Sequence, residues 1–169
     1  MCEQPTKTGS TKRGQTNQGF SLIELLIVVA VILIIAAIAI PNFIRSKMMA
    51  NEAAAVQNSR NITTAEVVYS TTYGIGFSAS MPALAGSGAV LDQNHAGLID
   101  DVLAAGTKSG YTFTYAIISQ DTNGNVTSYS LNANPISSNT GTRHFYTDQT
   151  AVIRANESAT AGPTDPALQ

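Results

Sequence analysis

The sequence predicts an α+β fold in which one long N-terminal helix packs on a four-stranded antiparallel sheet. An apolar run from Phe20 to Ile40 predicts the first half of the helix, and a mixed polar and apolar stretch to residue 73 predicts its continuation. Residues 110–155 instead alternate between apolar and polar side chains, which is typical of strands. With 169 residues in all, the chain is expected to form one small domain after the helix.

A polar leader, residues 1–19, precedes the apolar run and ends at Gly19. An ordinary secretory signal is cut after its apolar stretch, but a cut after Gly19 would remove the leader and keep the helix. Residues 20–40 have about the length that crosses a bilayer. Basic leader residues favour a cytoplasmic leader, so we expect a single-pass helix with the rest of the chain on the far side.

The hexapeptide Gly19–Glu24, of sequence Gly-Phe-Ser-Leu-Ile-Glu, resembles the start of type IV pilins and of the pseudopilins of type II secretion. The resemblance continues to about Pro41 and implies a pilin-like fold. It implies that a prepilin peptidase cuts between Gly19 and Phe20 and that the new Phe20 amine is N-methylated. An assembly ATPase and an inner-membrane platform protein are further partners that it implies.

Glu24 is the only charged residue between Phe20 and Ile40. A carboxylate at the centre of a membrane helix costs about 2.5 to 3.5 kcal/mol, so it usually has a partner. The cut would create one, because it turns the Phe20 nitrogen into an amine about one helical turn away. The resemblance implies that Glu24 pairs with the Phe20 amine of a neighbouring subunit and so sets the register of assembly. The alternative is that Glu24 lies near enough to the membrane interface to be hydrated.

Pro41 marks a helix kink or a boundary, because proline lacks an N–H donor and clashes with the preceding turn. Good helix formers follow it, and Gly74 is the expected stop. An unbroken helix over residues 20–73 would be about 80 Å long at 1.5 Å per residue. Such a rod is too long for a compact domain of this size and suits packing among several copies.

The rest of the chain is expected to form a head built on the second half of the helix. Residues 74–109 predict a variable loop with one short helix, over 98–103. Strands at 111–118 and 126–133 flank an Asn-Gly turn, which is a strong hairpin signal. Strands at 143–147 and 151–155 complete the predicted sheet, and residues 156–169 predict a mobile tail.

Composition excludes several kinds of site. Cys2, in the leader, is the only cysteine, so the mature chain would have no disulfide and no thiolate site. Asp121, Asn123 and Asn125 alternate as in a calcium loop, but the glycine is misplaced and no twelfth-position glutamate follows, so we expect a plain turn. No basic stripe predicts nucleic-acid binding, and no metal or cofactor is expected.

Together these features predict a non-enzymatic subunit of a homo-oligomeric type IV pilus filament. The subunit would cross the inner membrane once before assembly and then form an extracellular pilus. A pseudopilin in a periplasmic type II secretion piston is the alternative within the same family, and the sequence does not separate the two. A membrane-anchored enzyme would need a cluster of acid, base or metal-binding residues in 74–169, and the sequence contains none.

Overall fold

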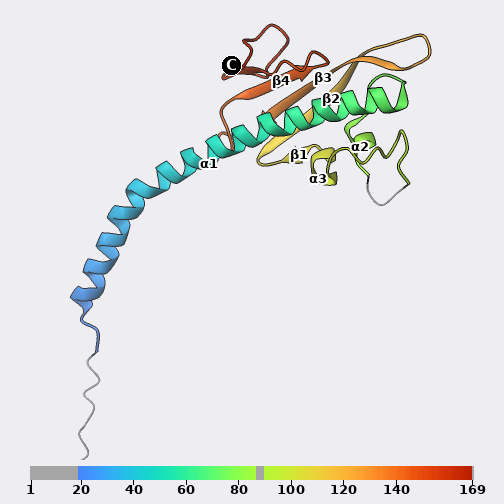
Figure 1. Cartoon of the computed structure of the whole chain (residues 1–169). Coiled ribbons are helices and arrows are strands. Elements are labelled where there is room, and N and C mark those ends of the chain that lie inside the picture. The colour runs from blue at the N-terminus through green and yellow to red at the C-terminus, as the bar shows by residue number, and fades with distance from the viewer. Residues whose placement is uncertain (1–18, 87–89, 169) are drawn as a thin grey trace, which may run out of the picture. The chain divides into compact units, whose positions relative to one another are not determined.

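The computed structural model describes residues 19–86 and 90–168 (Figure 1). The chain divides into two compact units, residues 1–40 and 41–169. The helix α1, Leu22–Tyr73, runs through the boundary between them and contains 52 residues. Nearly all of the predicted leader lies outside the described residues.

α1 ends where the sequence predicts. Gly74 has φ +66°, and its N–H donates to the carbonyl oxygen of Ser70 over 3.0 Å. Glycine adopts this left-handed conformation without a steric penalty, which makes it a common residue just beyond a helix end. Pro41 lies within α1, so the helix continues past it. The kink at Pro41 stays a prediction.

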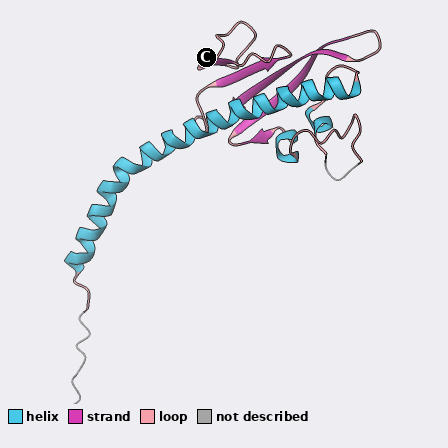
Figure 2. Ribbon diagram, viewed as in Figure 1, coloured by secondary structure: helices cyan, strands magenta, loops and turns pink. Residues whose placement is uncertain are grey.

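The second unit contains an antiparallel sheet in which each strand pairs with the next along the chain (Figure 2). We call the part of this unit that follows α1 the head. Two ten-residue strands form the centre of the sheet, namely β2, Tyr111–Gln120, and β3, Val126–Pro135. They are followed by β4, His144–Asp148, and β5, Arg154–Asn156. The four predicted strands are therefore all present.

The predicted number of strands was wrong by one. A short strand, β1, Thr107–Lys108, pairs with the start of β2 and makes the sheet five-stranded. Ser109 and Gly110 connect the two strands and both have positive φ, at 52° and 76°. Two such residues match the tight turn that suits a right-twisted hairpin. The sequence prediction placed Ser109 at the end of the loop and Gly110 at the start of the sheet, so it contained no turn here.

The core of the head lies between one face of the sheet and the second half of α1, which crosses the sheet in Figure 1. Tyr111 and Phe113 of β2 are buried, whereas Thr112 and Thr114 between them are exposed, as the period-two pattern predicts. The apolar side chains that α1 and the sheet bury together are those of Ala55, Ile62, Ala65, Tyr69, Tyr111, Phe113, Leu131, Ala133 and Phe145.

The segment between α1 and the sheet holds two short helices rather than the one predicted. α3, Asp101–Ala104, overlaps the predicted range, and the Asp100 side chain accepts the Leu103 N–H over 3.0 Å at its start. α2, Met81–Leu84, was missed. Its signal is Ser80 followed by a proline in the first turn, a position where the missing N–H has no partner to lose.

The residues after β5, which the sequence predicts as a mobile tail, make hydrogen bonds to the end of the sheet. The chain after β5 folds back, so that the Leu168 N–H donates to Ile153 O over 2.8 Å and the Ala155 N–H donates to Pro166 O over 3.1 Å. The Arg154 guanidinium donates to Asp165 O over 2.8 Å. Small and polar residues can be held in this way through their backbones, and the mobility of the tail stays a prediction.

Gly76 offers a sharp test of the head's packing. It has φ +81°, and a Cβ there would lie 2.2 Å from Val126 O, which also accepts the Phe77 N–H. Gly124, in the β2–β3 turn, has φ +85° but open space around it. We expect Gly124→Ala to cost about 1 to 2 kcal/mol from backbone strain alone and Gly76→Ala to cost clearly more. Thermal unfolding of both variants in detergent, followed by tyrosine circular dichroism, measures the difference. Equal losses would show that the Val126 contact is unimportant.

Candidate functional site

The predicted cleavage site lies just ahead of α1, in residues without helical structure. Gly19, Phe20 and Ser21 precede the first helical residue, Leu22. The Phe20 side chain is 83% exposed, and nothing lies within 4 Å of the position that a Cβ on Gly19 would take. A peptidase needs an accessible backbone that is not held in a helix, and the Gly19–Phe20 peptide bond lies ahead of α1.

Glu24 binds the start of its own helix. Its Oε2 accepts the Ser21 N–H over 2.9 Å, and the Glu24 N–H donates to Ser21 O over 3.1 Å. This is the carboxylate half of a capping box, in which the third helical residue reaches back to the residue before the helix. Ser21-x-x-Glu24 is the sequence pattern of this capping box, and it was not recognised from the sequence. Among the described residues no cation pairs with Glu24.

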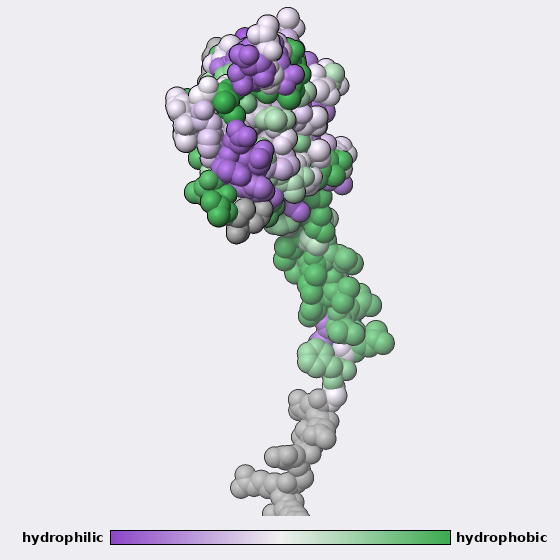
Figure 3. Space-filling model, turned by 90° about the vertical axis from the view of Figure 1, so that its right-hand side faces the viewer, coloured by the Kyte–Doolittle hydropathy of each residue, from purple (hydrophilic) through white to green (hydrophobic). Residues whose placement is uncertain are grey.

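The first half of α1 is an apolar surface without a protein partner in this chain. The large apolar side chains from Phe20 to Ile40 are between 48% and 83% exposed. In Figure 3 they form a continuous hydrophobic column along the helix. By length and composition α1 can cross a membrane. A surface of this extent needs cover from lipid or from other apolar helices.

Glu52 fastens the second half of α1 to the head at the start of β4. Its Oε1 accepts the Thr142 N–H over 2.9 Å, and its Oε2 accepts the Arg143 Nε–H over 2.7 Å. Burial raises the pKa of Glu52, but the donors from Thr142 and Arg143 outweigh that effect and hold the pKa below its ordinary value. Glu52 therefore contributes stability above the ordinary pKa of a glutamate, and that stability is lost as the pH falls through the lowered pKa.

Glu66 fastens the same helix to the segment that follows it. Its side chain is fully buried and accepts both the N–H of Ser78, over 2.8 Å, and the Ser78 hydroxyl. The Tyr115 hydroxyl of β2 donates to Ser78 O over 2.9 Å and completes the network. Among the residues that the structure describes, no lysine, arginine or histidine forms an ion pair with the Glu66 carboxylate.

Glu66 makes the stability of the head depend on pH in the direction opposite to that of Glu52. Burial raises its pKa, and the donors from Ser78 only partly offset that rise. Its contribution to stability is fully present below the unfolded pKa and is lost as the pH rises through the raised pKa. We expect Glu66→Gln to be more stable than the wild type at neutral pH and equal to it at low pH. Unfolding measured across pH checks this, and equal slopes for both proteins would contradict it.

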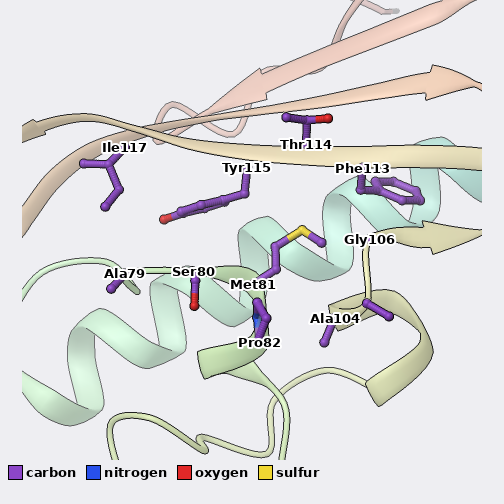
Figure 4. A pocket seen from close by; sticks show the side chains of 11 residues that line it. Ala79, Ser80, Met81, Pro82, Ala104, Gly106, Phe113, Thr114, Tyr115 and Ile117 are labelled. Carbon is purple, nitrogen blue, oxygen red and sulfur yellow. The ribbon is translucent and has the colours of Figure 1, made fainter.

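A hollow of about 520 Å³ lies in the head between α2, α3 and β2 (Figure 4). Met81, Phe113 and Ile117 give it an apolar lining, and its polar side chains are limited to Ser80, Thr114 and Tyr115. It contains no acid and base pair. Among the described residues no group of three or more histidine, cysteine, aspartate or glutamate side chains could hold a metal ion.

Comparison with known proteins decides what the N-terminal segment is. A family model described as the prokaryotic N-terminal methylation motif matches residues 14–40. The chain is also 52% identical over 50 residues to the type IV major pilin protein PilA of Myxococcus xanthus strain DK1622. The N-terminal segment therefore carries the methylation motif and is similar to the same segment of a type IV pilin. The match covers 30% of this chain and 23% of that pilin, so the chain spans under a quarter of the relative's length.

Within this pilin segment, the structure brings some predicted site residues together and separates another. Gly19 and Phe20 are adjacent, and Glu24 lies about one helical turn further on. Pro41 is 17 residues beyond Glu24 and belongs to the other compact unit. The long apolar helix and the antiparallel sheet give the pilin-like α+β architecture that the resemblance implies. Glu52 and Glu66 were not singled out from the sequence, because their burial depends on residues far along the chain.

Proposed function

We propose that this chain is a structural, non-enzymatic subunit of a type IV pilus filament. The observation that carries the proposal is the exposed apolar half of α1 within the methylation motif. The subunit is anchored in the inner membrane through residues 20–40 and leaves it by packing this half against the same half of other copies. The relative's printed name, a major pilin, supports the pilus over other roles.

Processing comes before assembly. A prepilin peptidase removes the leader after Gly19 and methylates the Phe20 amine. The exposed, non-helical backbone at this bond supports the cut, since a bond within a helix would have to unwind first. Cleavage also leaves a cation one helical turn from Glu24, where the precursor has only a neutral amide.

Transfer from lipid to fibre gains little hydrophobic free energy, because both surroundings are apolar. Helix packing and the pairing of Glu24 with the Phe20 amine of a neighbour therefore supply the specificity of assembly. An assembly ATPase and an inner-membrane platform protein supply the energy and the site. The head, held on α1 by Glu52 and Glu66, forms the surface of the fibre.

Mass spectrometry of material sheared from intact cells tests this function. We expect abundant peptide that begins with N-methylated Phe20 in the sheared fraction. Processed protein that stays in the cell envelope would instead indicate the pseudopilin of a periplasmic secretion piston. An intact leader ahead of Phe20 in every fraction would refute the proposal.

A further inference from the structure

The outer edge of β2 is covered by its neighbouring strand for only part of its length. β1 pairs with β2 at Tyr111 and Thr112 alone. One residue further on, the Phe113 N–H donates to Gly106 O over 2.7 Å. Two residues ahead of Gly106 the chain belongs to α3. In the part of the chain that the structure describes, no strand therefore continues along β2 beyond Phe113.

The hydrogen bonds of β2 show which backbone groups face this open edge. The Ile136 N–H, directly after β3, donates to Gly110 O over 3.0 Å, whereas Phe113 bonds on the opposite side. Successive residues of an antiparallel strand direct their N–H and C=O groups alternately to the two sides. The pairing of β2 with β3 keeps one register up to Ile117. The N–H and C=O groups of Tyr115 and Ile117 therefore face the same side as those of Phe113, and no described residue pairs with them there.

The sequence of this edge does not discourage a further strand. Natural sheets protect long edges with lysine, with proline or with bulges. Residues 113–119 contain no charged residue and no proline. A register shift between Ile117 and Ser119 limits the regular open stretch to Tyr115–Ile117. This stretch is a short template for one extended segment.

The hollow of about 520 Å³ borders the same edge. In Figure 4 it lies between the strand that carries Phe113, Tyr115 and Ile117 and the segment that carries Ser80 and Pro82. Its lining contains no charged side chain. Its volume falls in the range of about 300 to 1,000 Å³ that is usual for ligand pockets. The hollow therefore suits uncharged, apolar side chains that arrive with a chain paired to β2.

An added antiparallel strand would direct every second side chain into this hollow. A residue that exchanges hydrogen bonds with Tyr115 has its side chain on the same face of the sheet as Tyr115. The side chains of Phe113, Tyr115 and Ile117 share that face and line the hollow. The residues that bond to Tyr115 and Ile117 are therefore also those whose side chains reach the hollow.

We propose that the open edge of β2 binds an extended, uncharged peptide segment of another protein. The segment pairs antiparallel with Tyr115 and Ile117 and places apolar side chains, two residues apart, in the hollow beside them. In this mode of recognition the backbone hydrogen bonds supply affinity, and the pocket for alternate side chains supplies specificity. The contact needs only the folded head, so it goes beyond the filament function proposed above.

Binding of a synthetic peptide to the full-length chain in detergent tests the proposal. The probe is Thr-Val-Thr-Val-Thr with an amidated C-terminus and an uncharged fluorophore at its N-terminus, and fluorescence anisotropy measures its affinity. With both valines in the hollow, their N–H groups bond to β2, whereas the N–H of the central threonine faces away. We expect N-methylation of both valine nitrogens to weaken binding by about tenfold or more. N-methylation of the central threonine nitrogen is the matched control and should leave binding unchanged.

A proline at position 117 removes the same contact from the protein. The Ile117 N–H faces away from β3, so Ile117→Pro takes a donor from the open edge but no hydrogen bond from the sheet. Proline is tolerated at such edge positions. Ile117→Ala is the matched control, because it also shortens the side chain but keeps the N–H. We expect Ile117→Pro to bind the unmethylated probe about tenfold or more weakly than Ile117→Ala does.

Three results would overturn the proposal: equal affinity for the two methylated peptides, equal affinity of the two variants, or no saturable binding of the unmethylated probe. The near-ultraviolet dichroism of the tyrosines shows whether each variant is folded. If Ile117→Pro does not fold, the comparison of the methylated peptides on the wild type decides alone. A wild type that is dimeric in detergent, with a monomeric Ile117→Pro, would show that a second copy covers the edge and would also refute the proposed partner.

Discussion

Glu24→Ala subunits are expected to enter the membrane and lose their leader but to be left out of the fibre. Insertion depends on the apolar run and cleavage on the exposed Gly19–Phe20 bond, and neither needs the carboxylate. In the proposed assembly, incorporation depends on an anion that meets the Phe20 amine of another copy. We expect the share of this variant in sheared fibres to fall at least tenfold when it is expressed beside wild-type subunits, as counted by mass spectrometry of the two peptides.

Glu24→Gln is the matched control, because the structure shows a second role for this side chain. A glutamine keeps an oxygen that can accept the Ser21 N–H, but it has no charge to offer an amine. If Glu24 acts through its charge, Glu24→Gln is excluded from fibres as strongly as Glu24→Ala. If the glutamine variant assembles normally, the bond to Ser21 is the essential one and the register argument is wrong.

Glu52→Ala is expected to lower the free energy of unfolding of the head by about 2 to 3 kcal/mol. Removing one partner of a buried ion pair usually costs 3 to 5 kcal/mol, and the partly exposed Arg143 guanidinium reduces that cost because water can solvate it. The Thr142 N–H also loses its acceptor. Thermal unfolding of the full chain in detergent, followed by the near-ultraviolet dichroism of the tyrosines, measures the loss.

The effect should also depend on pH. The difference between Glu52→Ala and the wild type should shrink as the pH falls below the lowered pKa of Glu52, where the wild-type carboxylate is protonated too. Asp101→Ala provides the comparison, since its side chain is exposed and unpartnered, and it should leave unfolding unchanged. A pH-independent loss in Glu52→Ala would point to packing rather than to charge.

Local patterns in the sequence predicted most of the fold. The apolar run, the stop at Gly74 and the alternation around Tyr111 each depend on neighbours within a few residues. The errors arose where structure depends on distant contacts. Burial of Glu66 requires Ser78 and β2, and the ordered course of the chain after β5 requires backbone partners at Ile153 and Ala155. No short window of sequence contains that information.

The same division holds for the candidate site. Gly19, Phe20 and Glu24 could be singled out from one hexapeptide because the methylation motif is a local stretch of chain. The attachment made by Glu52 could not be found this way. Its partners, Thr142 and Arg143, lie 90 and 91 residues further along the chain.

The two buried glutamates also bear on mechanical strength. Glu52 and Glu66 are 14 residues apart, so they hold the head to α1 at points separated by about 21 Å. Tension along a fibre would reach the head through the helix and would strain both attachments at once, in shear. Separation of the head from α1 then requires the simultaneous loss of both sets of hydrogen bonds. We therefore expect a pulled fibre to break between subunits before a head separates from its own helix.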